Sequence, residues 1–438
     1  MEDNPLADRC PWAEFDFSST DYAEHWRERY AGMPAVAHSS RHGGFWVVSS
    51  YAEATRVARD PRSFSSDHDP DGEREGYRGV GIPRSVGTRS LPQEADPPDA
   101  LFYRRLMNPL FTPAAADRWQ PWTEALVDRI LSEHLPTGRI DLADDLGFPV
   151  PARFTVALLG LPDQDWRRLV DPFHVLVTTP PTDPRYAAAA EGLDAILAEL
   201  REVIAQRRTA PGGDLLSVLT AGSSGERPLT DDEVLSIAQL MLFGGVDSTT
   251  AAFSSAMHWL DEHPDQAERL RGDPALLDTA TDEFLRYFSP IHLNGRTVRN
   301  DIELGGCALK AGDRLLISWA GANLDPDAVP DADRLVLDRT GVRHLAFGAG
   351  VHRCLGANYA LMMVKAMLRA VLARIPDCRV DRAGAVRCPS VGQVNGFTRL
   401  PAVFAPRPSA PGPSAPGPSA PRPSAPGPDA PQRGCRDQ

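Results

Sequence analysis

The stretch FGAGVHRCLG, residues 347–356, stands directly before a long apolar helical pattern that ends at a proline. Cys354 is therefore expected at or just before a helix N-terminus, where unpaired backbone N–H groups and the helix dipole stabilise a thiolate. Gly348 and Gly350 permit a tight turn beside it, and Gly356 leaves room above the helix start. A thiolate presented in this way predicts a metal ligand or a nucleophile.

The sequence also bears on other roles for this cysteine and its loop. A lone cysteine is most often a small buried hydrophobe. A zinc site built on His352 and Cys354 lacks a second pair of ligands. A dinucleotide-binding loop requires a glycine where Arg353 stands. A cysteine nucleophile requires a general base, and the sequence marks out no histidine for that role.

The composition is that of an ordinary globular protein. The chain has 438 residues, of which 42% are hydrophobic and 24% charged, enough for one large domain or two ordinary ones. Its net charge of −13 argues against an extended nucleic-acid-binding surface. Six scattered cysteines without a CxxC pair argue against a disulfide scaffold. The N-terminus has no apolar signal region, and no apolar run approaches about eighteen residues, so we expect a cytoplasmic protein without a membrane span.

Local patterns predict a few short strands and many helices. Residues 66–95 lack an apolar period and are expected to form a functional or disordered loop. Asn395-Gly396 is a hairpin signal between short strands. Strands are predicted at 45–50 and 314–320, and helices over 51–58, 101–111, 119–134, 188–206, 275–288 and after Cys354.

The most distinct helical pattern runs from Leu229 to His263. Thr230 and Glu233 form a capping-box pattern at its start. A single helix of this length would be about 50 Å long and would cross a whole domain. The adjacent glycines Gly244 and Gly245 each cost about 1 kcal/mol in a helix interior. Either close approach of a bound group or contact with another helix would offset that cost.

The C-terminal part has a different character. SAPGP-type repeats follow one another every five residues from Ser409. Such a sequence cannot bury a core and predicts an extended, disordered segment. We therefore expect one folded domain over residues 1–406 and a Pro/Ala/Ser/Gly-rich tail over residues 407–438.

Residues 347–356 resemble the haem-binding signature FGxGxHxCLG of the bacterial cytochrome P450 superfamily of haem-thiolate monooxygenases. Two further motifs appear in the order of that family. Glu283 and Arg286, in DEFLR, match its ExxR pair, which can form a charge-assisted contact one helical turn apart. Arg334, in PDADRL, matches the arginine that completes the structural triad.

The glycine-rich part of the long helical pattern resembles the family's central-helix motif. Asp247 stands next to the hydroxyls of Ser248 and Thr249, and an acid beside a hydroxyl suits proton delivery. The hydroxyl is expected to bond back to a helix carbonyl and loosen the helix. Ser248 stands where the family usually has threonine. It keeps the hydroxyl but lacks the methyl that fixes the rotamer.

The resemblance also implies a set of groups for the haem propionates. Arg104, in DPPDALFYRRLMNPLF, matches the propionate-binding arginine of the family. Arg296 and His352 match the remaining propionate partners, and two guanidinium groups with an imidazole suit two carboxylates. Ala100 stands where the family usually has a histidine. The signature residues assigned to the cofactor are Phe347, Gly348, Gly350 and Gly356.

The implied fold is mainly α with a small β-rich subdomain, the cytochrome P450 prism. Cys354 would be the ligand of the iron of haem b, and its electron donation favours O–O cleavage. Electrons from NAD(P)H would arrive through a ferredoxin and its reductase, because no redox domain is recognised in the sequence. A local basic face at Arg104, Arg105, Arg343 and Arg353 would receive an acidic ferredoxin. A monomer is expected.

The implied reaction is insertion of one oxygen atom from O2 into a hydrophobic small molecule, by hydroxylation or epoxidation. The approach to Arg104 resembles that of bacterial terpenoid hydroxylases, and we expect a terpenoid or polyketide natural product of secondary metabolism. Two rivals stay open, a desaturation, coupling or rearrangement on the same haem and a haem-dependent sensor. The pocket is expected to be lined by Phe243, Val246, Leu293, Asn294 and Val394.

Overall fold

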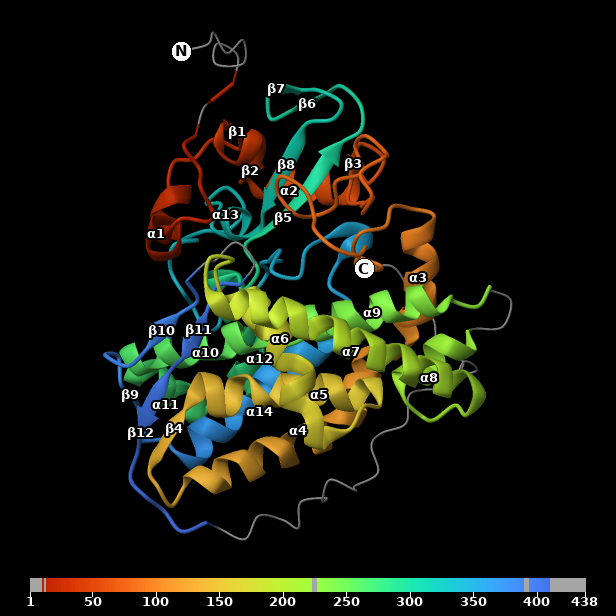
Figure 1. The fold of residues 1–438 in the computed structure, drawn as a ribbon. Helices are drawn as coiled ribbons and strands as arrows, with labels where there is room; N and C mark the ends of the chain where they lie inside the picture. Colours follow the sequence, from red (N-terminus) through yellow and green to blue (C-terminus); the bar gives the residue numbers. More distant parts are fainter. Residues whose placement is uncertain (1–9, 12, 223–226, 390–393, 410–438) are drawn as a thin grey trace.

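The computed structural model describes the whole chain except residues 1–9, 12, 223–226, 390–393 and 410–438. It shows a mainly helical protein with a smaller β-rich region, as the sequence predicts. In Figure 1 the β-rich region stands at the top and the helices fill the lower part. The described helices are α1 (Thr20–Tyr30), α2 (Tyr51–Arg59), α3 (Asp99–Met107), α4 (Pro113–His134), α5 (Pro149–Leu159), α6 (Trp166–Thr178), α7 (Pro184–Thr209), α8 (Leu215–Ala221), α9 (Asp231–Gly244), α10 (Asp247–Glu262), α11 (Pro264–Gly272), α12 (Leu277–Phe288), α13 (Trp319–Asn323) and α14 (Ala357–Arg374).

The β-rich region is built on one sheet of five strands, in the order β1-β2-β8-β5-β3. β2 and β8 run parallel, and β5 pairs antiparallel with β8. Three smaller sheets contain the other strands. The described strands are β1 (Val36–Ser39), β2 (Phe45–Val48), β3 (Phe64–Ser65), β4 (Arg139–Asp141), β5 (Leu293–Val298), β6 (Ile302–Leu304), β7 (Cys307–Leu309), β8 (Arg314–Ser318), β9 (Arg379–Val380), β10 (Val386–Arg387), β11 (Phe397–Arg399) and β12 (Pro401–Val403).

Both faces of the large sheet are buried, which explains the continuous apolar run predicted at β2. Phe45 and Val47 pack in one cluster with Tyr22 and the other rings of α1. Trp46 and Val48 alternate with them and pack in a second cluster that contains residues of α2. The sheet therefore packs between α1 and α2. Two of its own strands, β5 and β8, reach toward the helical part of the molecule (Figure 1).

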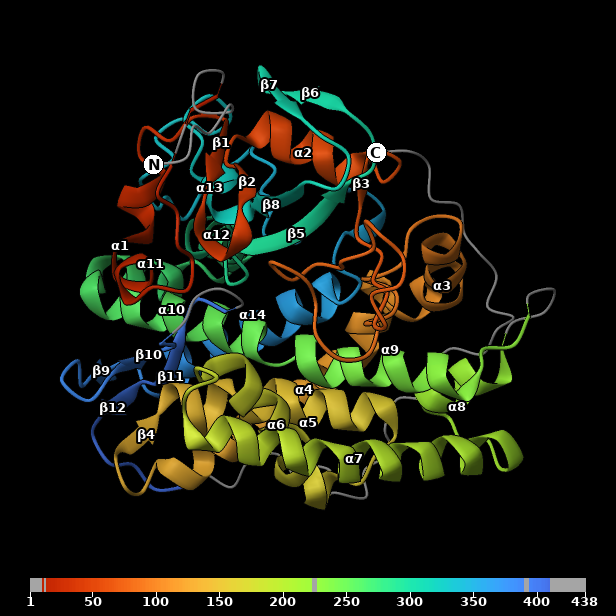
Figure 2. The ribbon, with the colours of Figure 1, turned by 45° about the horizontal axis from the view of Figure 1, so that its top comes forward.

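The single long helix predicted over residues 229–263 is wrong, because the structure has two helices there. α9 ends at Gly244 and α10 begins at Asp247, and they follow one another across the molecule (Figure 2). Gly245 lies in the break, where a Cβ would come within 2.7 Å of the Met241 carbonyl oxygen. The predicted capping box at Thr230 is confirmed.

The α9–α10 stretch meets the length and hydropathy criteria for a membrane span. It runs over Asp231–Glu262, and its most apolar part has a mean hydropathy of 1.2. More than half of that part, 56%, is buried inside the fold. A buried core helix satisfies the same criteria, so this feature is weak evidence for a span.

The loop over residues 66–95 is tied to the large sheet by buried polar contacts. Gly295 of β5 donates its N–H to the Val80 carbonyl at 2.7 Å. Arg314 of β8 donates to the Gly79 carbonyl at 2.8 Å, and its burial lowers its pKa to about 9. Glu94, which is buried, accepts the N–H of Val80 at 3.1 Å. This base of the loop is ordered, and the disordered alternative is wrong for it.

The later part of the same loop rests on α9. Thr88 donates its hydroxyl to the amide oxygen of Gln239 at 3.1 Å. The Leu91 N–H donates to the hydroxyl of Ser236 at 2.9 Å. Between the two anchored parts, Val86 is 93% exposed. The loop therefore spans from the sheet to α9 with an exposed tip.

The predicted Asn395-Gly396 hairpin turn is wrong. The pairing strands are β10 and β11, and the connection between them is longer than two residues, with residues 390–393 outside the described part. Asn395 and Gly396 lead directly into β11, and the Asn395 side chain donates to the Phe288 carbonyl at 3.0 Å. Its amide is used to dock the segment on the end of α12.

The folded domain reaches at least to Arg407, one residue beyond the expected boundary. Arg407 donates its N–H to the Leu135 carbonyl at 2.9 Å and a guanidinium N–H to the Arg374 carbonyl at 2.9 Å. It also forms an ion pair with Asp377. The repeats expected to form a disordered tail lie almost entirely in residues 410–438, outside the described residues.

Candidate functional site

The cysteine loop, residues 347–356, is a tight backbone turn, as its glycines predict. The Cys354 N–H donates to the Phe347 carbonyl at 2.7 Å. Gly348 and Gly350 have φ values of +65° and +69°, a conformation that L-residues with a Cβ seldom adopt. A Cβ at Gly350 would also collide with the backbone of Ala58. The loop therefore delivers Cys354 to the start of α14 by backbone geometry.

The sulfur of Cys354 has both an open side and close protein neighbours. The residue is exposed, yet the protein packed around its thiol raises the pKa. The N–H of Gly356 and the guanidinium groups of Arg353 and Arg104 act in the opposite direction. The stabilisation expected from the helix start is present, but in the protein alone it does not outweigh burial.

Arg104, Arg296 and His352, predicted separately in the sequence, act on one another across this site. Burial, together with smaller effects of the nearby Arg296 and Arg104 charges, lowers the pKa of His352 to about 3. Burial also lowers the pKa of Arg296 to about 10. Arg104 donates to the Arg353 carbonyl at 2.8 Å, and His352 contacts the Ser66 hydroxyl at 2.9 Å.

Their charges are not neutralised by the protein. In the described part of the chain, no carboxylate lies within ion-pair distance of Arg104, Arg296 or His352. Two partly or fully buried guanidinium groups without such a partner favour a bound anion. The donor set therefore fits a group that carries two carboxylates and a metal ion above the cysteine. Ala100, where the family has a histidine, is fully buried in the main core.

Glu283 and Arg286 form the buried pair that the sequence predicts. Two guanidinium N–H groups of Arg286 donate to the Glu283 carboxylate, at 2.7 and 2.8 Å. Both residues are buried on α12. Arg286 also donates to the carbonyls of Asn323, Ala332 and Arg334 at 2.8 Å each. The pair thus fixes the irregular segment that leads to the cysteine loop.

The third member of the triad is Arg339, and the prediction of Arg334 is wrong. Arg339 donates its Nε–H to the Glu283 carboxylate at 3.0 Å. The side chain of Arg334 is exposed, and only its carbonyl takes part, accepting from Arg286 and Arg339. Both arginines lie in irregular backbone, where spacing along the sequence does not tell which side chain points back to α12.

The α9–α10 junction, residues 244–249, brings a glycine, an acid and a hydroxyl together. Gly244 is exposed, and a Cβ there would meet only the Leu240 side chain at 3.9 Å. The Ser248 hydroxyl donates to the Gly244 carbonyl at 3.2 Å, so the predicted bond back to the helix is confirmed. Thr249 is buried. Asp247 is the first residue of α10 and is also buried.

The sequence analysis missed His174, the partner of Asp247. His174 of α6 lies with its Nδ1 2.5 Å from a carboxylate oxygen of Asp247. Burial acts to lower the pKa of His174, but the nearby Asp247 carboxylate outweighs it and the pKa is raised. The two residues are 73 positions apart. A histidine on the apolar face of an amphipathic helix was the only available signal.

Two of the five predicted pocket residues meet in one apolar cluster. Val394 packs with Val177 of α6 and Ala251 of α10, and Phe243 lies against them. Cys388 belongs to the same cluster, and burial followed by the Asp247 carboxylate raises its pKa to about 12. The cluster therefore lies beside the α9–α10 junction.

The other predicted pocket residues are used elsewhere. Leu293 packs with the rings of α1, and Val246 is fully buried in the main core. Their place in a pocket stays a prediction. The amide oxygen of Asn294 accepts the Trp319 indole N–H at 2.8 Å. Asn294 therefore keeps its amide N–H groups and the second lone pair of its oxygen for a ligand.

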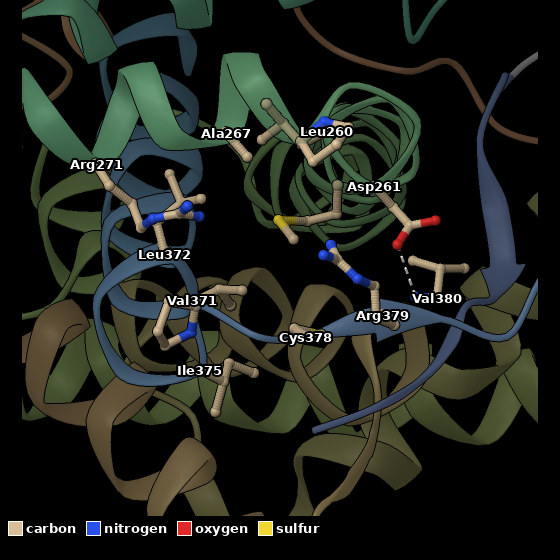
Figure 3. A pocket seen from close by; sticks show the side chains of 13 residues that line it. Leu260, Asp261, Ala267, Arg271, Val371, Leu372, Ile375, Cys378, Arg379 and Val380 are labelled. Carbon is tan, nitrogen blue, oxygen red and sulfur yellow. Dashed lines mark hydrogen bonds between the residues drawn. The ribbon is translucent and has the colours of Figure 1, made fainter. Parts of the chain in front are cut away.

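A separate small cleft of about 60 Å³ lies between the ends of α10 and α14 (Figure 3). Its walls include Leu260 and Asp261 of α10 and Val371 and Ile375 at the end of α14. Cys354 precedes the start of α14, and a helix rises 1.5 Å per residue, so the cleft is about 25 Å from the cysteine. It does not belong to the site.

Comparison with known proteins identifies the family that the sequence motifs resemble. The family model described as Cytochrome P450 matches residues 139–375, more than half of the chain. The chain is 33% identical to cytochrome P450 monooxygenase PikC of Streptomyces venezuelae, over 84% of this chain and 86% of that protein. It is 30% identical to linalool 8-monooxygenase of Pseudomonas putida, over 83% and 90%.

A solved structure agrees with these relatives. The structure of a mutant of P450 EryK in complex with erythromycin B superposes with a TM-score of 0.76 at 30% identity, covering 88% of this chain and 96% of that one. Membership of this family brings a haem cofactor and electrons from redox partners. The chain belongs to the bacterial cytochrome P450 superfamily and is a haem-thiolate monooxygenase.

Proposed function

We propose that this enzyme inserts one oxygen atom from O2 into a terpenoid or polyketide natural product, by hydroxylation or epoxidation in secondary metabolism. The single observation that carries the proposal is Cys354, presented at the start of α14 by a tight glycine loop. The relatives support the substrate class by their names, which include linalool 8-monooxygenase and 6-deoxyerythronolide B hydroxylase.

Cys354 is proposed as the ligand of the iron of haem b. When bound, the haem supplies the activation of O2, and thiolate ligation favours O–O cleavage. Coordination would also hold the Cys354 sulfur as a thiolate, because a metal ion deprotonates a coordinating thiol. Arg104, Arg296 and His352 are proposed to hold the propionates, and their unneutralised charge supports this role.

The residues of the α9–α10 junction are proposed to move protons. Asp247 would hold a proton at its carboxylate, and the Ser248 hydroxyl, with Thr249 behind it, would pass it toward the reaction. The bond from Ser248 to the Gly244 carbonyl supports this role, since it keeps the serine hydroxyl in one position despite the missing methyl. Gly244 leaves open space on the same side of the helix.

The apolar cluster of Phe243, Val394, Val177 and Ala251 is proposed as a wall of the substrate pocket. Burying a hydrophobic substrate against it favours binding by roughly 25 cal/mol per Å² of apolar surface. Asn294 would provide a polar contact through its remaining amide N–H groups. This combination suits a mainly apolar molecule that carries an oxygen.

Electrons are proposed to come from NAD(P)H through a ferredoxin and its reductase, to a monomeric enzyme in the cytoplasm. Arg105, Arg343 and Arg353 are exposed, and Arg353 adjoins Cys354. An exposed basic face beside the thiolate would attract an acidic ferredoxin although the whole chain has a net charge of −13.

The first test is the spectrum of the reduced, CO-bound protein, which must show the long-wavelength Soret band of thiolate ligation. A band at the position of a histidine-ligated haem would refute the proposal. The second test is a screen of terpenoids and macrolides for displacement of the haem-bound water. Product analysis with a surrogate ferredoxin system then separates oxygen insertion from desaturation, coupling or rearrangement.

A further inference from the structure

The contact between His174 and Asp247 joins α6 to the start of α10. His174 lies on α6 and Asp247 on α10, and their Nδ1 and Oδ1 atoms are 2.5 Å apart. The histidine side chain is 25% exposed, whereas that of the aspartate is 4% exposed. The buried acid therefore has one neighbour that reaches toward the protein surface.

His174 is the one side chain that orients Asp247 within the described residues. No other side chain there forms a hydrogen bond or an ion pair with the Asp247 carboxylate. The carboxylate sits at the first turn of α10, where free backbone N–H groups stabilise an anion. Its rotamer and its proton exchange therefore depend on an imidazole from α6.

The surroundings of His174 favour the imidazolium. Asp247, Asp171 and Asp144 all act to raise its pKa against the effect of burial. Arg167, on the same helix, lies 3.9 Å from Asp144 and 4.0 Å from Asp171 and offsets part of their charge. The Phe148 ring packs on the imidazole with 4.4 Å between the centroids and limits its rotation.

We propose that His174 is the positioning residue of Asp247 and links it to protons at the surface. One proton moves from Nδ1 of the imidazolium to Oδ1 of the carboxylate, which leaves a neutral imidazole and a neutral carboxyl. The carboxyl gives up that proton on the side of Ser248, and water returns one to the imidazole. Protons and charge then balance over each turnover. The inference rests on the role proposed above for Asp247.

A purely structural ion pair would hold α6 on α10 without affecting proton movement. The two roles differ in what they change. A structural pair alters stability and substrate binding, whereas a positioning role alters the rate of the proton-dependent step and its dependence on pH. The decisive readouts are therefore the pH profile and the solvent isotope effect, with KM as the reference.

The first experiment compares the holoenzyme with His174→Gln and His174→Lys variants, using an accepted substrate. In His174→Gln, kcat should fall on the order of tenfold, less than the roughly 10²–10⁴-fold of a direct general acid or base, because His174 acts through Asp247. KM should stay unchanged and the solvent deuterium isotope effect on kcat should rise. In His174→Lys, which restores a cation, part of the lost kcat should return. His134→Gln, which removes a histidine 3.8 Å from Asp145, is the matched control.

Either of two results overturns the inference. One is a His174→Gln variant with the kcat, pH profile and isotope effect of the wild type. The other is a variant whose KM alone changes, since that is the signature of a structural role. The His134→Gln control must retain all three wild-type parameters.

A second experiment reads the pair without turnover. The Cε1–H signal of His174 is titrated by NMR in the reduced, CO-bound holoenzyme, which is diamagnetic, and in its Asp247→Asn variant. The pKa of His174 should be lower in the variant, because the Asp247 carboxylate raises it. Equal values in both proteins would show that the pair does not form and would overturn the inference. A missing thiolate band in the same samples would instead refute the proposed function.

Discussion

Backbone hydrogen bonds within residues 347–356 hold Cys354, whereas a histidine from a different helix holds Asp247. The cysteine loop depends on glycine conformations and is continuous in sequence. The α9–α10 junction depends on side chains that are brought together only by folding. The first should therefore respond to changes in backbone shape, and the second to changes in charge and pH.

The largest expected effect is the loss of the thiolate. Cys354→Ala should abolish the long-wavelength band of the reduced, CO-bound protein and all monooxygenase activity, because that band requires a thiolate ligand of the iron. The spectrum and product formation measure this. Cys378→Ala, at a half-buried cysteine at the opposite end of α14, should keep both. A retained band in Cys354→Ala would refute the assignment of the ligand.

The triad beneath the cysteine loop should give the next largest effect. Glu283→Gln leaves Arg286 buried without its counter-charge and should destabilise the protein by about 3–5 kcal/mol. Arg339→Ala should cost roughly 1.5–3 kcal/mol, because it removes a charge-assisted hydrogen bond. Arg334→Ala should change stability by less than about 0.5 kcal/mol. Urea unfolding ranks the three, and an equal cost for both arginines would contradict the assignment of Arg339.

Adding one methyl group to the cysteine loop and one to the α9–α10 junction tests the comparison directly. Gly350→Ala should destabilise the fold by at least about 1–3 kcal/mol, because of its φ of +69° and the Ala58 carbonyl. Gly244→Ala should not destabilise it, because open space surrounds that position and alanine favours helix. Thermal unfolding measures both. A destabilised Gly244→Ala variant would mean that the junction is as tightly packed as the loop.

The junction should also respond to pH. The folded state raises the pKa of His174, so its stabilising effect is complete below the unfolded pKa of about 6.5 and is lost as the pH rises through the folded value. The difference in unfolding free energy between wild type and His174→Gln should therefore shrink with rising pH. Denaturant titrations across the neutral range measure it. A difference that grows with pH would reverse the sign and exclude the ion pair.

The smallest effect is expected at the surface beside the loop. Charge reversal at Arg105 and Arg343 should raise the KM for an acidic ferredoxin several-fold, most strongly at low salt, where electrostatic attraction is least screened. Reduction kinetics at two salt concentrations measure this. Arg201→Glu, on α7, is the control. Unchanged reduction by ferredoxin in the double variant would refute the proposed basic face.

The sequence predicts those parts of the molecule that are local. The cysteine loop, the capping box at Thr230 and the Glu283–Arg286 pair each lie within a few residues of chain, where spacing and glycine conformation decide the geometry. The strands at β2 and β8 are marked by apolar, β-branched runs.

Tertiary contacts explain what the sequence could not predict. Arg339 and not Arg334 reaches Glu283, because irregular backbone between α13 and the loop determines where each side chain points. His174 meets Asp247 only after α6 packs beside the junction. Gly245 in the break has no room for a Cβ beside the Met241 carbonyl and the Thr155 hydroxyl, and the hydropathy pattern of α9 and α10 does not reveal this.

The loop over residues 66–95 sets a limit for anyone who redesigns substrate choice. Its base contacts β5 and β8, and β5 carries Arg296, so substitutions at Gly79 or Glu94 would also disturb the strand that holds this proposed propionate partner. Its tip has no such connection, because Val86 is 93% exposed. Combinatorial libraries are therefore best concentrated at Val86, where new side chains leave the contacts of β5 and β8 intact.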